Sequence, residues 1–200
     1  MTVNYGNPVT VTIDTCIFYD KAEMRDGNVD FDEIIRLTKS GIFKLFFTAS
    51  TDFEDISGMA TKVAMSLLRE GVLSEDPNAG TLRDYMPYGV GTHYVNESTV
   101  HEMFGAIWPE ARWLSRSSFN KESDILGLLA HKMNGREIYL TRDGELLDRA
   151  KNIKDRFEIS VMHPRDLLLP YRPSSRLGRL IKPYEWGRIL YCASDNRVDP

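Results

Sequence analysis

The sequence predicts an α/β domain, a three-layer α/β/α sandwich whose central sheet is mostly parallel. Short runs of β-branched and aromatic residues alternate along the chain with segments whose apolar residues recur at helical spacing. Strands joined through helices pair in parallel, and right-handed crossovers cover both faces of the sheet. The functional crevice of such a sheet lies beyond the carboxyl ends of its strands.

The first part of the chain supplies two strands and two helices. Residues 9–13 (VTVTI) are all β-branched and predict a buried strand, and residues 43–48 (FKLFFT) predict a second strand. Residues 30–40 and 56–70 each carry an apolar stripe at helical spacing that stops at a glycine. The order is therefore strand, helix, strand, helix.

The second part repeats this alternation. The predicted elements are a helix at 120–134, a strand at 137–141, a helix at 145–157 and a strand at 158–162. Between the two parts, residues 74–91 are rich in Pro, Gly and Asp and predict a long loop or flap. Residues 98–108 predict a short amphipathic helix that stops at Pro109.

We expect one domain over residues 1–169, with an irregular insertion at about residues 72–118, and a basic, aromatic tail over residues 170–200. From Arg165 onward the chain has seven Lys and Arg residues against four Asp and Glu residues, with tyrosines and Trp186 among them. Two interpretations stay open: the tail docks on the domain through its aromatic rings, or it binds nucleic-acid phosphates and bases.

The composition is that of a globular protein, with 200 residues, 42% hydrophobic and 27% charged residues, and a net charge of −4. No apolar run approaches the roughly 18 residues of a membrane span, and the N-terminus lacks the pattern of a secretory signal. The two cysteines, Cys16 and Cys192, are too few for a disulfide framework or a thiolate zinc site. We therefore expect a cytoplasmic protein.

Four acidic residues stand where this fold would bring them together. Asp14 and Asp143 each come just after a predicted strand, and Glu54 lies a few residues past another. Asp124 opens a predicted helix and joins them if that helix starts at the same edge of the sheet. Each acid alone also has a structural explanation, as a turn residue or as an acid at a helix N-terminus.

Clustered carboxylates repel one another, so a group of four predicts a bound cation. Oxygen ligands favour Mg²⁺ or Mn²⁺ over zinc, which prefers nitrogen and sulfur. Other catalytic patterns do not fit. The sequence has no glycine-rich phosphate loop, no G-x-S-x-G elbow and no second aspartate two residues after Asp14, and its four histidines show no i,i+4 pair.

Three segments resemble PIN-domain nucleases. Residues 11–15 (VTIDT) look like the opening strand of that family, and residues 48–54 (TASTDFE) are similar to its Ser/Thr-rich turn before a glutamate. The most specific likeness is residues 123–168, where a helix, a glycine and a strand ending in Thr141-Arg142-Asp143 look like the family's helix–Gly–strand–Thr-x-Asp block. The resemblance covers roughly residues 9–70 and 120–169.

This resemblance implies a four-carboxylate catalytic site that holds Mg²⁺ or Mn²⁺. Its acids would be Asp14, Glu54, Asp124 and Asp143, with the hydroxyls of Thr15 and Thr141 lining the site. Arg142, Lys132 and Arg136 lie near these acids in the sequence and either hold the RNA backbone or are ordinary surface charges.

The chain departs from the family pattern in three places. Cys16 stands where an asparagine is common, and Asp52 or Asp55 competes with Glu54 for the second acidic position. Glu145 adds another acid, which is either a further ligand or the start of a helix. None of these departures removes an acid that the mechanism needs.

The leading hypothesis is a metal-dependent endoribonuclease that cleaves single-stranded or structured RNA and leaves 5′-phosphate and 3′-hydroxyl ends. One alternative is a PIN-like module that binds RNA or a protein partner without cutting. Another is the toxin of a toxin–antitoxin pair, restrained by a small antitoxin. Membership of the family would also imply a tendency to form homodimers.

Overall fold

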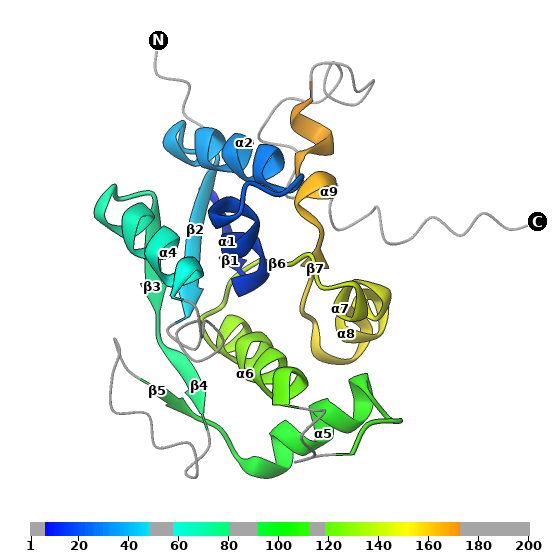
Figure 1. The fold of residues 1–200 in the computed structure, drawn as a ribbon. Coiled ribbons are helices and arrows are strands. Elements are labelled where there is room, and N and C mark those ends of the chain that lie inside the picture. Colours follow the sequence, from blue (N-terminus) through cyan, green and yellow to red (C-terminus); the bar gives the residue numbers. More distant parts are fainter. Residues whose placement is uncertain (1–6, 49–57, 81–91, 113–118, 173–200) are drawn as a thin grey trace, which may run out of the picture.

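The computed structural model describes residues 7–48, 58–80, 92–112 and 119–172, and the architecture is shown in Figure 1. Its main sheet has five strands in the order β3-β2-β1-β6-β7, and every neighbouring pair is parallel. These strands are β1 (Val9–Ile13), β2 (Phe43–Thr48), β3 (Leu73–Asp76), β6 (Ile138–Leu140) and β7 (Val161–Met162). A separate two-stranded parallel sheet pairs β4 (Asn78–Gly80) with β5 (Thr92–Tyr94).

Helices lie on both faces of the main sheet, which confirms the predicted three-layer sandwich (Figure 1). One face is covered by α1 (Thr15–Ala22), α2 (Asn28–Lys39), α4 (Met59–Arg69) and α9 (Pro164–Leu168). The other is covered by α5 (Glu97–Ile107), α6 (Phe119–Met133), α7 (Gly144–Asp148) and α8 (Ala150–Phe157). A 3-10 turn, η2 (Leu169–Tyr171), follows α9.

Alternation of side chains along the strands divides the core between the two faces. In β6, Ile138 and Leu140 pack with the cluster under α1, α2 and α4, whereas Tyr139 packs with the cluster under α5 and α6. β1 is likewise two-sided, because Val11 belongs to the first cluster while Thr12 bonds His131 of α6. Burial on both faces explains why these strands read as continuous β-branched or apolar runs.

Several element predictions are wrong in detail. Residues 74–76 and 78–80 belong to β3 and β4 rather than to a loop, so the expected irregular insertion begins with strands. The predicted helix at 145–157 is two helices, because Arg149 separates α7 from α8. The helix that carries Asp124 starts at Phe119, which places Asp124 in its second turn rather than its first.

The first residues of the predicted tail dock on the domain. Tyr171 lies edge-on against Phe43, with ring centroids 5.3 Å apart, and burial raises the pKa of its phenol to about 12. Arg172 pairs with Asp30 of α2 at 2.6 Å. Residues 173–200 lie outside the described residues. No helix within the described ranges is long and apolar enough to cross a membrane.

The direction of the chain changes at β1. The chain runs from β1 outward to β2 and β3, and then returns to the other side of β1 to form β6 and β7. In open parallel sheets, ligands bind at such a switch point, beyond the carboxyl ends of the two strands where the order reverses. Here those strands are β1 and β6, and the residues that follow them are Asp14 and Thr141.

Candidate functional site

Asp14 occupies the turn between β1 and α1. Its backbone N–H continues the sheet by donating to the carbonyl of Leu140 on β6 at 3.0 Å. Its side chain caps α1, since Oδ1 accepts a 2.7 Å hydrogen bond from the N–H of Thr15. The strand before Asp14 thus fixes its backbone, and the helix after it fixes its side chain. Asp14 is 8% exposed.

Two neighbouring donors hold the other oxygen of the Asp14 carboxylate. The hydroxyl of Thr141, which is completely buried, donates to Asp14 Oδ2 at 2.5 Å. The thiol of Cys16 donates to the same oxygen at 3.1 Å. Thr141 follows β6, so this bond joins the carboxyl ends of the two strands at the switch point.

Asp143 is tied to the same hydroxyl from the other side. Its backbone N–H donates to Thr141 Oγ1 at 2.9 Å, while its carboxylate Oδ1 caps α7 by accepting from the N–H of Leu146 at 3.0 Å. Thr141 therefore stands between two aspartates, as donor to one and acceptor from the other. We refer to Asp14, Cys16, Thr141 and Asp143 together as the Asp14–Asp143 site.

The electrostatics of this site disfavour its negative charge. Burial is the main cause that raises the pKa of Asp14, and the charge of Asp143 raises it further, against three hydrogen bonds that lower it. Burial beside Asp14 also raises the pKa of the Cys16 thiol well above its ordinary value, so Cys16 stays neutral. Within the described part of the chain, no lysine or arginine forms an ion pair with Asp14 or Asp143.

Asp124 lies in the second turn of α6. Lys121 lies three residues before Asp124, on the same side of the helix. Its ammonium pairs with Glu145 in the first turn of α7, the helix that Asp143 caps. The structure therefore sets the start of α6 beside the start of α7. Glu54, the fourth predicted acid, lies outside the described residues.

Of the remaining predicted site residues, Thr15 contacts Asp14, whereas the side chains of Arg142 and Lys132 are directed elsewhere. Thr15 is buried and contributes its backbone N–H to Asp14. Arg142 lies between Thr141 and Asp143, but its guanidinium turns to Asp20 of α1 at 2.6 Å. Lys132 is exposed in the last turn of α6, eight residues and so about 12 Å along the axis from Asp124. The structure thus keeps Lys132 apart from the acid on its own helix.

Glu145 and Arg136, whose roles the sequence left open, are engaged elsewhere. Glu145 Oε2 accepts from the indole N–H of Trp108 at 3.0 Å and pairs with Lys121, which lowers the pKa of its carboxyl. Arg136 pairs with buried Asp76 and stacks over the ring of Phe46, 3.5 Å from its centroid. Both residues therefore join elements of the fold.

The donor chemistry of the site suits a hard cation that takes only a few of its ligands from the protein. Asp14 Oδ1 and Asp143 Oδ1 each receive one backbone hydrogen bond, and no donor among the described residues binds Asp143 Oδ2. In the described ranges, no three His, Cys, Asp or Glu side chains lie close enough to hold a metal ion together. Mg²⁺ commonly binds proteins through only one or two carboxylates and keeps water at its other positions.

Sequence reasoning missed Asp20, a buried acid of α1 that binds Arg142. Its signal was present but weak: Asp20 stands four residues after Cys16, on one face of a helix that itself was not predicted.

No protein-family model and no curated protein matches the chain.

Proposed function

We propose that the chain is a metal-dependent ribonuclease that hydrolyses RNA phosphodiester bonds at the Asp14–Asp143 site. The observation that carries this proposal is the bridge from Asp14 through Thr141 to Asp143, at the switch point of the sheet, with no lysine or arginine of the described chain paired to either carboxylate. A diffusible cation is the natural partner for two such acids.

Helix capping alone does not account for this arrangement. Asn, Ser and Thr cap helices about as well as Asp, and they carry no charge. Two charged caps side by side raise the free energy of the metal-free fold, since Asp143 adds to the burial that raises the pKa of Asp14. Such a cost is typical of functional sites, where burial and like charges shift pKa values.

The residues have distinct roles in the proposed reaction. Asp14 and Asp143 would hold Mg²⁺ or Mn²⁺, with Asp124 and Glu54 as further acids acting through water. When bound, the ion supplies charge neutralisation at the phosphate and a lowered pKa for water. Thr141 fixes the separation of the two aspartates, and the N–H of Thr15 orients the Asp14 carboxylate.

The choice of RNA as substrate, and of 5′-phosphate ends as products, depends on the resemblance of the four acids to those of PIN-domain nucleases. A site that holds a cation between carboxylates attracts a phosphate only through that cation, because the acids themselves repel it. RNA cleavage should therefore be absent without metal.

The test compares the wild type with Asp143→Asn and with Asp148→Asn, a matched control. Asp148 is exposed on the same short helix, and the substitution makes the same change of charge. With Mn²⁺ we expect wild type and control to cleave total cellular RNA to 5′-phosphate ends, and Asp143→Asn to lose at least 100-fold in rate, on the order of 3 kcal/mol in transition-state stabilisation. Equal cleavage by Asp143→Asn would refute the site.

Two other outcomes correspond to the alternatives. A protein that binds RNA tightly but cuts no RNA class with Mn²⁺ is a binding module. A protein that becomes active only after a small co-purified polypeptide is removed is a toxin with its antitoxin.

A further inference from the structure

A buried acid of α1 holds the residue at the centre of the Thr141–Asp143 turn. Asp20 is only 4% exposed, and its Oδ2 accepts a 2.6 Å hydrogen bond from Arg142 Nη1. A second cation, Arg25, lies farther off, with its Nη1 4.0 Å from Asp20 Oδ1, and also pairs with Glu23. Arg142 is thus the closer partner of Asp20.

α1 holds Arg142 at two points, one helical turn apart. Cys16 and Asp20 are separated by four residues and so lie on the same face of α1. The Cys16 sulfur accepts the backbone N–H of Arg142 at 3.2 Å, while Asp20 takes its guanidinium. Both the main chain and the side chain of Arg142 are therefore attached to one rigid element.

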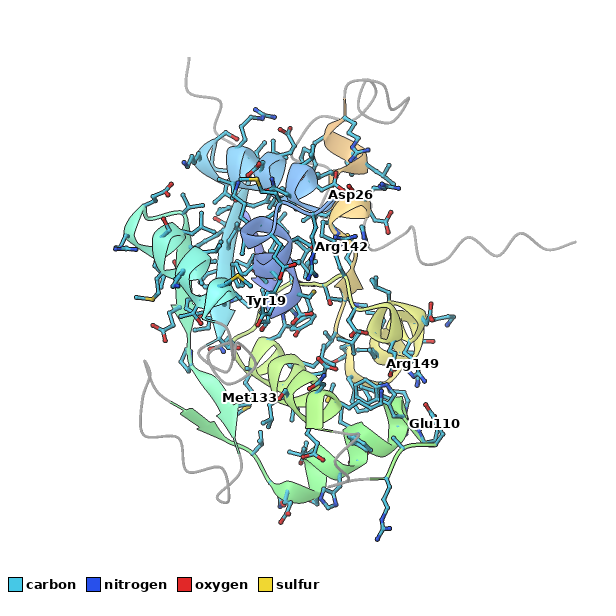
Figure 2. The ribbon with its side chains drawn as sticks, viewed as in Figure 1. Tyr19, Asp26, Glu110, Met133, Arg142 and Arg149 are labelled. Carbon is cyan, nitrogen blue, oxygen red and sulfur yellow. The ribbon has the colours of Figure 1, made fainter. Side chains whose placement is uncertain are left out.

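The surrounding chain leaves space for this ion pair. A Cβ atom on Gly27, at the start of α2, would lie 2.4 Å from both Arg142 Nη1 and Asp20 Oδ2. The backbone of Gly27 has φ −68° and ψ −15°, which any residue adopts. A side chain at this position would therefore displace the ion pair for lack of space, and not because of backbone conformation. Figure 2 shows Arg142 beside the α1–α2 connection, which also carries Asp26.

We propose that Asp20 is a positioning residue of the Asp14–Asp143 site, because by holding Arg142 it fixes the turn that carries Thr141 and Asp143. This inference rests on the proposed function. Thr141 bonds both aspartates, so a shift of the turn would change the separation of the two carboxylates. Asp20 itself touches neither metal nor substrate in this proposal and acts only through Arg142.

The experiment measures Mn²⁺ affinity by titration calorimetry, together with urea unfolding, for wild type, Asp20→Asn, Arg142→Gln and the double variant. We expect each single substitution to weaken Mn²⁺ binding roughly 10-fold, the usual effect of removing a group that orients a ligand. The double variant should bind Mn²⁺ no more weakly than the weaker-binding of the two single variants, because both changes break the same interaction.

Asp32→Asn is the matched control. Asp32 of α2 pairs with Lys21 of α1 at 2.5 Å, so this change also breaks an ion pair made by α1, but one that is exposed and does not involve Arg142. Its Mn²⁺ affinity should equal that of wild type. Gly27→Ala gives a second route if Asp20→Asn does not fold, since it displaces the pair while keeping both charges.

Three results would overturn the inference: wild-type affinity in folded Asp20→Asn and Arg142→Gln, losses that multiply in the double variant, or, where Asp20→Asn does not fold, wild-type affinity in Gly27→Ala. If Asp143→Asn loses Mn²⁺ in the same titration, the proposed function survives such a result. If the wild type itself binds no Mn²⁺, the proposed function and the positioning role fail together.

Discussion

Thr141 and Asp14 are joined by a 2.5 Å hydrogen bond although 127 positions separate them in the sequence. Each residue directly follows one of two neighbouring parallel strands, so the bond links the carboxyl end of β1 to that of β6. The same hydroxyl accepts the N–H of Asp143. One buried side chain therefore sets the spacing of the two acids.

Thr141→Val should destabilise the fold by about 1–3 kcal/mol, because it keeps the shape but removes the hydroxyl that bonds Asp14 and Asp143. Urea unfolding monitored by circular dichroism would measure this. Thr141→Ser, which retains the hydroxyl, should recover most of the loss. Equal stability of the valine variant and the wild type would show that the bridge contributes nothing.

Mn²⁺ should stabilise the wild type against heat and urea, by about 2.7 kcal/mol at a metal concentration 100-fold above Kd. The ion favours the folded state because only the folded chain brings the two carboxylates together. The gain should vanish when EDTA is added, because EDTA removes the ion. Asp14→Asn should remove most of the response, whereas Asp148→Asn should keep it. A response of the same size in Asp14→Asn would mean that the ion binds elsewhere.

Glu145→Gln should leave the Mn²⁺ response unchanged, although Glu145 stands only two residues after Asp143. Its carboxylate is engaged by Lys121 and by the indole of Trp108. A differential scanning fluorimetry titration with Mn²⁺ would check this, with Asp143→Asn as the positive control. A reduced response in Glu145→Gln would make it a ligand after all.

The stability of the protein should fall with pH below about 6.5 because of His131. Burial, with help from the charges of Arg136 and Lys154, lowers the pKa of this imidazole to about 3. Its Nδ1 lies 2.8 Å from Thr12 Oγ1 in the core. In the unfolded chain the imidazole of His131 therefore takes up a proton near pH 6.5, whereas in the folded chain this imidazole stays neutral until about pH 3.

The sign follows from this difference in bound protons. Below pH 6.5 the unfolded state is favoured by about 1.4 kcal/mol per pH unit, so His131 alone should cost about 2 kcal/mol between pH 7 and pH 5. Urea unfolding at both pH values should show a smaller loss in His131→Gln, which cannot be protonated. Parallel losses in the two proteins would contradict the assignment.

Strands β1, β2, β6 and β7 of the main sheet and the position of the two acids were predictable from the sequence because strong local signals determine them. β1 (VTVTI) and β6 (IYL) are runs of β-branched or apolar residues, and a parallel sheet places the residues after them at one edge. The convergence of Asp14 and Asp143 follows from that geometry. The place of Asp124 depends instead on where α6 begins, at Phe119 rather than at the predicted residue 120.

The missed features depend on contacts between distant segments. α1 has a short sequence, TCIFYDKA, with weak helical amphipathicity, and burial of both Ile17 and Phe18 stabilises it only within the fold. β3 contains polar residues and is a strand because it pairs with β2. Arg142 was predicted either to hold the RNA backbone or to be an ordinary surface charge. Its ion pair with Asp20 spans 122 positions, and no local pattern reveals such a partner.

The long separation between Asp14 and Thr141 also affects how the protein is made. At about 5–20 residues per second, synthesis would deliver Thr141 roughly 6–25 seconds after Asp14. During that interval the growing chain carries the first aspartate without the strand that completes its surroundings. Under the proposed function, the nascent polypeptide should therefore be inert toward RNA until β6 inserts beside β1.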